Sequence, residues 1–181
     1  MSSTLVRTRH DLLAQFEFAA RTAYATVEFV PSSAVALAAA VGRVAHGRIA
    51  IAEPLDIAHE LFAELRRMPG IVTRRSKAEL ASCDAGITDA FAGVARTGSV
   101  CVTVDHEYAG AISLLSRLHI AVLSAETIVE RPADLFRPDR LAGKGLTRNF
   151  VFVTGPSATA DMGPLVRGVH GPHKLHVILL E

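Results

Sequence analysis

The sequence predicts an α/β fold whose mainly parallel sheet is covered by helices. Short runs of aliphatic and β-branched residues alternate with stretches in which apolar residues recur at helical spacing. The connections between these segments are short, and strands joined through helices pair in parallel. Half of the 181 residues are apolar, which suits a core that buries roughly 70% of the unfolded surface. We therefore expect residues 1–181 to form a single domain.

The first 73 residues follow this alternating order closely. Leu12, Phe16 and Ala20 recur on one side of an amphipathic segment, which predicts a first helix. Pro31 and the two serines after it are a typical helix start for the alanine-rich stretch that follows. We expect helices over residues 10–23, 34–45 and 56–68, and strands over 26–30, 48–52 and 71–73.

The middle of the chain departs from the alternation. Residues 88–104 contain two extended runs separated by Thr97, Gly98 and Ser99, which predicts an inserted β-hairpin. A helix ending near Ser116, a strand over 119–123 and a partly helical segment over 126–140 should follow. Residues 141–149 have no apolar periodicity, so they form either a lid over a site or an ordinary surface loop.

Composition excludes several classes of partner. The chain has 19 Lys and Arg against 18 Asp and Glu, and it has no Trp. Nucleic-acid binding needs a basic patch and often aromatic stacking, so we expect no nucleic-acid partner. The longest apolar run is too short to cross a bilayer, and the first residues do not have the pattern of a signal peptide. We expect a cytoplasmic protein without a membrane partner.

Metal and cluster chemistry is not expected in this chain. Cys83 and Cys101 are the only cysteines, and they form no CxxC motif. His170, His173 and His176 are spaced three apart, but a Gly-Pro pair between the first two forbids one continuous helix. On a strand this spacing would turn successive rings to opposite faces. We therefore expect no metal and no cofactor bound by these residues.

Three common catalytic signatures are missing. The sequence has no GxSxG nucleophile elbow, no GxGxxG after a strand and no P-loop. These absences argue against an α/β-hydrolase, a dinucleotide-dependent oxidoreductase and a P-loop enzyme.

The stretch FVFVTGPSATADMG, residues 150–163, is the strongest candidate for a ligand site. We expect a buried strand that ends in a turn of small and hydroxyl residues and leads into a helix. Free backbone N–H groups of the turn that contains Gly155, Pro156, Ser157 and Thr159 would then hold an anion, or the turn is an ordinary hydroxyl-capped connection. Proline has no N–H, so Pro156 would only shape the turn.

Two titratable residues follow this turn. His170 could face it, where it would bind the anion or transfer a proton near neutral pH. Asp161 could orient that histidine, or it could simply cap the expected helix. His170 and Asp161 are the candidate catalytic pair.

Three quoted stretches resemble the LUD-domain family of lactate-utilisation proteins. They are GITDAFAGVARTGSVCV, SLLSRLHIAVL and TGPSATADMGPLVRGVHGPHKLHVILLE, and the resemblance covers residues 84–181. It implies a fold related to glucosamine-6-phosphate deaminase, ribose-5-phosphate isomerase and the CoA transferases. It also implies a role in oxidising L-lactate to pyruvate beside partner chains that carry iron–sulfur clusters.

The family pattern places functional positions on four segments of this chain. This chain departs from the family pattern at two main positions: Arg96 stands where the family usually has an acidic residue, and Gly110 stands where an arginine is common. A milder departure is Gly163, at a position that tends to be acidic in the family. Arg96 could not serve as nucleophile or base, so it would instead bind an anion or be an ordinary surface residue. The matched positions are Gly86, Thr88, Thr97, Gly98, Ser99, Gly155, Pro156, Ser157, Thr159, Asp161, His170, Gly171, Pro172 and His176.

Two functions therefore remain open at this stage. The resemblance implies a non-cluster component of an iron–sulfur-dependent L-lactate oxidation system. The alternative is a free-standing enzyme or binding protein for a small anionic metabolite, such as a phosphorylated sugar or an acyl-CoA-like ligand.

Overall fold

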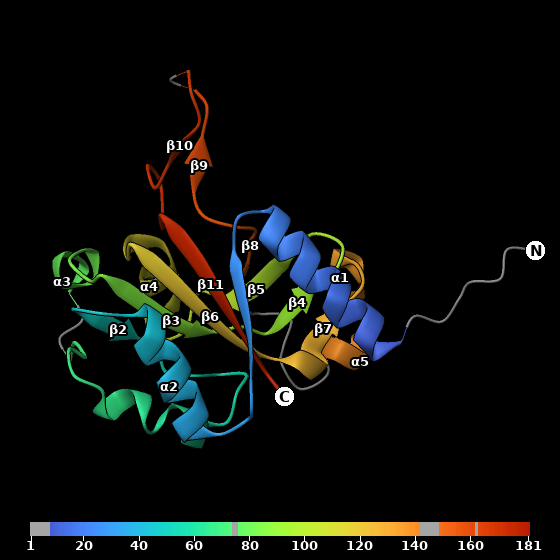
Figure 1. Cartoon of the computed structure of the whole chain (residues 1–181), viewed down its shortest axis with the longest axis horizontal. Helices are drawn as coiled ribbons and strands as arrows, with labels where there is room; N and C mark the ends of the chain where they lie inside the picture. Colours follow the sequence, from blue (N-terminus) through green and yellow to red (C-terminus); the bar gives the residue numbers. More distant parts are fainter. Residues whose placement is uncertain (1–7, 74–75, 142–148, 162) are drawn as a thin grey trace, which may run out of the picture.

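Five parallel strands form the central sheet of the computed structural model, which describes residues 8–73, 76–141, 149–161 and 163–181 (Figure 1). Every neighbouring pair in this sheet runs parallel. The predicted α/β class with a mainly parallel sheet is confirmed. The strands, in spatial order, are β1 (Thr26–Val30), β11 (Lys174–Leu180), β6 (Leu118–Ser124), β3 (Ala85–Asp89) and β2 (Ile49–Ile51).

One face of the sheet is covered by α2 (Ala34–Val44) and two short 3-10 turns, η1 (His59–Phe62) and η2 (Leu65–Arg67). Leu37, Phe62 and Leu65 are completely buried there. The single helix predicted over 56–68 is wrong. The chain before η1 is held to the sheet through the backbone N–H of Leu55, and Pro69 disfavours a helical residue before it.

The opposite face is covered by α1 (Arg9–Thr22), α3 (Lys77–Ala81), α4 (Ala109–Leu115) and a second sheet. Thr8 and Asp11 form a capping box that starts α1, and Phe16 and Ala20 bury its inner side. The first predicted helix is therefore confirmed. The two covered faces give the molecule three layers (Figure 1).

The second sheet contains the predicted hairpin. β4 (Ala92–Val94) and β5 (Ser99–Thr103) pair antiparallel around the turn at residues 95–98. β7 (Ile128–Val129) extends the sheet beside β4, and β8 (Phe150–Val153) extends it beside β5. The hairpin is confirmed, and it is the centre of a four-stranded sheet.

The segment between β6 and β8 is partly helical, as predicted. It contains η3 (Ala125–Thr127), η4 (Pro132–Phe136) and α5 (Pro138–Leu141) around the short β7. Residues 142–148 of the predicted loop lie outside the described residues. The strand predicted over 71–73 is reduced to a single bridge between Ile71 and Ile49.

The strand before the candidate turn is not buried. In β8 the side chains of Val151 and Phe152 are 45% and 38% exposed, because β8 pairs only with β5 and lies at the end of its sheet. The prediction of a core strand at 150–153 is therefore wrong.

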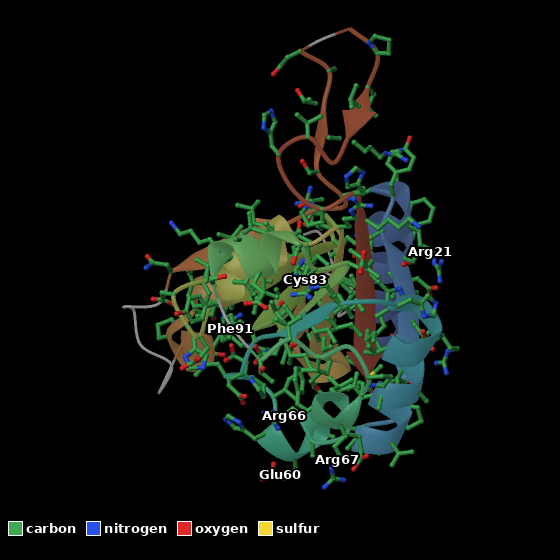
Figure 2. All side chains as sticks on the ribbon, turned by 90° about the vertical axis from the view of Figure 1, so that its left-hand side faces the viewer. Arg21, Glu60, Arg66, Arg67, Cys83 and Phe91 are labelled. Carbon is green, nitrogen blue, oxygen red and sulfur yellow. The ribbon has the colours of Figure 1, made fainter. Side chains whose placement is uncertain are left out.

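The turn is also not followed by a helix. β9 (Ala158–Thr159) and β10 (Val166–Arg167) pair antiparallel and form an arm that stands off the body (Figures 1 and 2). The chain folds back because Ser157 donates its N–H to Pro172 and accepts one from Gly168, at 2.9 Å each. The helix start expected near residue 157 is wrong, and Asp161 therefore caps no helix there.

No helix in the described part of the chain is long and apolar enough to span a membrane.

Candidate functional site

A cavity of about 240 Å³ lies between β6, β8, β11 and α4. We call it the small cavity. The candidate turn forms one wall, and the segment around His170 forms another. Among the predicted site residues, Gly155, Pro156, Ser157, His170 and Gly171 all line it. The structure thus brings together two sequence segments that were singled out separately.

His119 on β6 is the most buried polar group of the small cavity. Its ring is 1% exposed, and its Nε2 lies 2.9 Å from the hydroxyl of Thr88 on the neighbouring strand β3. Its Nδ1 has no hydrogen-bond partner among the described residues. Burial lowers the pKa of His119 to about 4, so the ring is neutral at pH 7. One buried ring nitrogen therefore makes no hydrogen bond within the described part of the chain.

The alternation of β6 places His119 on this side of the sheet. Leu118, Ile120 and Val122 belong to the core beneath α2, whereas Ala121 and Leu123 belong to the opposite core. Gly86 beside His119 allows α4 to approach, because an added Cβ would lie 2.5 Å from the Ile112 carbonyl oxygen. His119 is not among the site residues predicted from the sequence, although a lone histidine in an apolar strand was a usable signal.

A chain of hydroxyl groups joins the hairpin turn to the candidate turn. The Oγ1 of Thr97 lies 2.7 Å from the Oγ of Ser99, which lies 2.6 Å from the Oγ1 of Thr154. The two predicted turns are therefore neighbours in space. Ligand binding by Thr97 and Ser99 stays a prediction, because their hydroxyls already bind each other and Thr154.

The two turn glycines pack tightly against the end of α1. An added Cβ at Gly98 would lie 2.1 Å from the Ala20 nitrogen, and one at Gly155 would lie 1.9 Å from the Ala23 oxygen. Both have positive φ, +65° and +70°. These positions therefore require glycine for backbone shape and close approach, and any contact with a ligand stays a prediction.

Arg96 and Asp161 do not line the small cavity. Arg96 is exposed, and its N–H donates to the carbonyl of Glu130. Asp161 is exposed on the arm, where its own N–H donates to the hydroxyl of Thr159. The structure therefore does not place Asp161 against His170 through any described contact.

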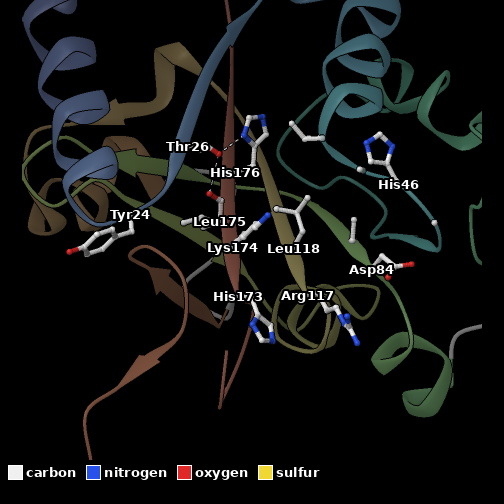
Figure 3. Close-up of a pocket in the computed structure, with 14 residues that line it drawn as sticks. Tyr24, Thr26, His46, Asp84, Arg117, Leu118, His173, Lys174, Leu175 and His176 are labelled. Carbon is white, nitrogen blue, oxygen red and sulfur yellow. Dashed lines mark hydrogen bonds between the residues drawn. The ribbon is translucent and has the colours of Figure 1, made fainter. Parts of the chain in front are cut away.

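The other family positions lie elsewhere. Gly110 is in α4, where an added Cβ would lie 2.9 Å from the Val104 carbonyl oxygen, so a larger residue would need a shift. Gly163 is on the arm with no atom within 4 Å of such a Cβ. His176 faces the other side of the sheet, where it lines a hollow of about 1130 Å³ (Figure 3). This hollow runs along the first residues of β1, β11, β6 and β3, and we call it the large groove.

The small cavity has a mostly apolar wall with a few uncharged polar groups. The described residues that line it include no Lys, Arg, Asp or Glu. Its hydrogen-bonding groups come from His119, His170, Ser113 and Ser157, and apolar contacts come from residues such as Leu175. Such a wall suits a small molecule with one or two polar ends.

The described cysteines do not fit an iron–sulfur cluster. Cys83 and Cys101 are both buried and belong to different core clusters. Burial raises the pKa of Cys83, and it raises the pKa of Cys101 to about 12, so both stay thiols. Among the described residues, no group of three His, Cys, Asp or Glu side chains could hold a metal ion.

The fold is that of an α/β domain with a five-stranded parallel central sheet. The family model described as the LUD domain matches residues 20–180, and the chain belongs to this family. The resemblance drawn from the sequence motifs is confirmed.

Among the proteins that resemble this chain are two lactate-utilisation proteins and one solved structure. "Lactate utilization protein C" of Oceanobacillus iheyensis is 30% identical over 134 residues, which are 70% of this chain and 58% of that protein. "Lactate utilization protein B" of Bacillus pumilus is 23% identical over 69% of this chain and 26% of its own length. The crystal structure of a DUF162 family protein from Deinococcus radiodurans superposes with a TM-score of 0.68 at 23% identity, covering 97% of this chain and 99% of that one. This last likeness shows the fold alone.

Proposed function

We propose that this LUD domain takes part in lactate utilisation by binding a small carboxylate metabolite in the small cavity, while partner chains carry the electron-transferring clusters. The names of the two relatives support the first part, although the chain spans only 58% and 26% of their lengths. Lactate and pyruvate are the carboxylates that such a process uses and forms.

The unpartnered Nδ1 of His119 carries the proposal. A buried polar group without a hydrogen bond costs about 1–3 kcal/mol, so a ligand that satisfies it gains that amount. When the Thr88 hydroxyl donates to Nε2, the proton of the neutral ring is on Nδ1. Nδ1 then donates to a carboxylate oxygen in the cavity.

The rest of the cavity suits a three-carbon acid. Its volume of about 240 Å³ is small, and Leu114 and Leu175 offer apolar contact to a methyl group. Ser157 and His170 supply further hydrogen-bonding groups from the two other walls. The backbone N–H of Ser157 already donates to Pro172, so side chains hold the anion in this proposal.

The cysteines support the assignment of clusters to partner chains. A cluster held by thiolates needs about four of them, and this chain has two buried cysteines far apart in sequence. The match to a limited part of a longer lactate-utilisation chain supports a domain that works beside other modules.

Calorimetric titration with L-lactate and with pyruvate tests the ligand. We expect wild-type protein to bind at least one acid, and His119→Asn to bind it at least tenfold more weakly. His10→Asn, on the exposed side of α1, is the matched control and should bind as the wild type does. Absence of binding, or equal binding by the His119 variant, would refute the role of the small cavity.

Anaerobic affinity purification of the tagged chain from its host tests the partners. We expect iron-containing chains to copurify and the assembly to oxidise lactate with an artificial acceptor. An iron-free, inactive single chain would contradict the assembly and favour a free-standing enzyme or binding protein.

A further inference from the structure

The arm formed by β9 and β10 projects beyond the rest of the chain (Figures 1 and 2). Its two strands pair over only two residues each, and a two-stranded hairpin alone is marginally stable at best in water. The N–H of Gly168 donates to Ser157 and the guanidinium of Arg167 contacts Tyr24, but both contacts lie at the base of the arm. A surface outside this copy of the chain would therefore stabilise the outer part of the arm.

The side chains of the arm are those of an interaction surface. Leu165, Val166 and Val169 are 57%, 42% and 51% exposed within five positions of one another. Exposed apolar residues that occur singly are ordinary, whereas a group of them marks a contact site. Asp161 is the only acidic residue between Thr154 and Lys174; it is exposed and forms no ion pair with a described residue. The arm thus presents apolar groups and one negative charge.

The large groove is complementary to the arm in both respects. Its lining includes the apolar side chains of Val44, Leu118 and Leu175. Lys174 is exposed in the groove and forms no ion pair with a described residue. Asp84 also lines the groove, but its carboxylate accepts the N–H of Arg48 at 2.9 Å. The groove therefore offers apolar contact and an ammonium group without a carboxylate partner.

The base of the arm borders the groove of its own chain. His173 and Tyr24 line the groove, while an added Cβ at Gly168 would lie 2.4 Å from the His173 ring and Arg167 lies 4.1 Å from the Tyr24 ring centre. Ten residues lie between Ser157 and Gly168, so the arm reaches out about 15 Å at about 3.3 Å per residue. A two-fold axis beside this base would bring each arm to the groove of the other copy.

We propose that two copies of this chain form a two-fold dimer in which the arm of each copy lies in the large groove of the other. Leu165 and Val166 then pack on the apolar lining, and Asp161 pairs with Lys174 of the partner subunit. The 14 residues that line the groove and the nine described residues from Ala158 to Arg167 match the roughly 20–30 residues that a standard interface uses on each side. This assembly does not depend on the proposed role in lactate utilisation.

Sedimentation equilibrium of the full chain tests the dimer. We expect the wild type to be dimeric at micromolar concentration, and Leu165→Ser to raise the dimer Kd about tenfold or more, because it removes a central apolar contact. Val35→Ser is the matched control, since Val35 is 72% exposed on α2 and lies outside both the arm and the groove lining. It should dimerise as the wild type does. Circular dichroism should show both variants folded.

A charge exchange tests which surfaces meet. Asp161→Lys and Lys174→Asp should each raise the dimer Kd about tenfold or more, because each places two like charges together. The double variant should recover most of the wild-type affinity, since the attraction returns with its sign reversed. Such recovery supports contact between the arm of one copy and the groove of the other.

Three results would overturn the proposal. The first is a monomeric wild type, which would leave the groove to a small molecule or a different protein. The second is a dimer that Leu165→Ser and the two single charge variants leave unchanged, because its interface would then lie elsewhere. The third is a double variant as weak as the single ones, which would exclude the pairing of Asp161 with Lys174 of the partner subunit.

Discussion

The small cavity and the large groove start from the same strand ends but have opposite character. The small cavity is lined by a fully buried neutral histidine, His119, and by hydroxyl groups. The large groove is open and carries Arg117 and Lys174. Because side chains alternate along a strand, Leu118 faces the groove while His119 faces the cavity.

This difference determines how each hollow would recognise a ligand. Buried groups discriminate among ligands, because an unsatisfied partner inside the protein is costly. Exposed cations attract many anions from solution and gain less from each contact, since water and salt screen them. The small cavity is thus suited to selecting one small molecule, and the large groove to attracting anions with little selectivity.

The largest expected effect compares one glycine from each hollow. Gly155 in the small cavity and Gly47 in the large groove have similar φ, +70° and +78°. An added Cβ at Gly155 would meet the Ala23 backbone oxygen at 1.9 Å, whereas one at Gly47 would meet the movable Asp84 carboxylate at 2.2 Å. We expect Gly155→Ala to lower the free energy of unfolding by about 3–5 kcal/mol and Gly47→Ala by about 1–2 kcal/mol.

Urea unfolding of the two glycine variants measures this difference. Equal losses would mean that the wall of the small cavity adapts as easily as the loop of the large groove. The rigidity that we assign to the small cavity would then be wrong.

The next effect is the pH dependence that His119 gives to stability. In the folded state the pKa of His119 is lowered to about 4, whereas the unfolded chain binds the proton below about 6.5. Stability from this residue is therefore complete above pH 6.5 and is lost as the pH falls toward 4. The total loss is about 3 kcal/mol.

Urea titrations of the wild type and His119→Asn from pH 7 to pH 4 check this effect. We expect the wild type to lose about 3 kcal/mol more than the variant over this range, because other groups titrate in both proteins. Parallel curves would show that the ring is hydrated or protonated in the folded state.

The regular elements could be predicted from the sequence because their signals are local. Apolar spacing marked α1 and α2, and the turn around Gly98 marked the hairpin. A run such as FVFV did not show whether β8 lies inside or at the end of a sheet, since both positions favour the same residues. Small polar residues such as those after Gly155 are favoured both at a helix start and in a turn that leads into a two-stranded antiparallel arm.

The features that escaped prediction depend on contacts between distant residues. The helix expected over 56–68 is replaced by η1 and η2. Just before them, the carboxylate of Asp89 on β3 accepts the backbone N–H groups of Leu55 and Asp56 and so ties this segment to the sheet. Arg117 and Lys174 become neighbours only through the pairing of β6 with β11. The sequence shows His119 in a strand, but only the structure shows that its Nδ1 has no hydrogen-bond partner among the described residues.

A smaller effect is expected on the local stability of the arm, whose residues contact both hollows. Ser157 and His170 line the small cavity, while Arg167 contacts Tyr24 beside the large groove. Arg167→Ala removes an exposed cation–π contact of about 0.5–1 kcal/mol. We expect faster hydrogen exchange at the amides of β9 and β10 with little change in the global melting temperature. Unchanged exchange would show that the hydrogen bond from the N–H of Gly168 to the carbonyl of Ser157 stabilises the arm without help from the cation–π contact.

The smallest expected effect is the stability change caused by Arg117→Gln. Arg117 is exposed and forms no ion pair with a described residue, so its removal should change the free energy of unfolding by less than about 0.5 kcal/mol. Urea unfolding without ligand measures this change. A near-zero change would mean that Arg117 is not needed for folding. A loss above about 2 kcal/mol would mean that the cation supports the fold, and the contrast between the two hollows would then lose its basis.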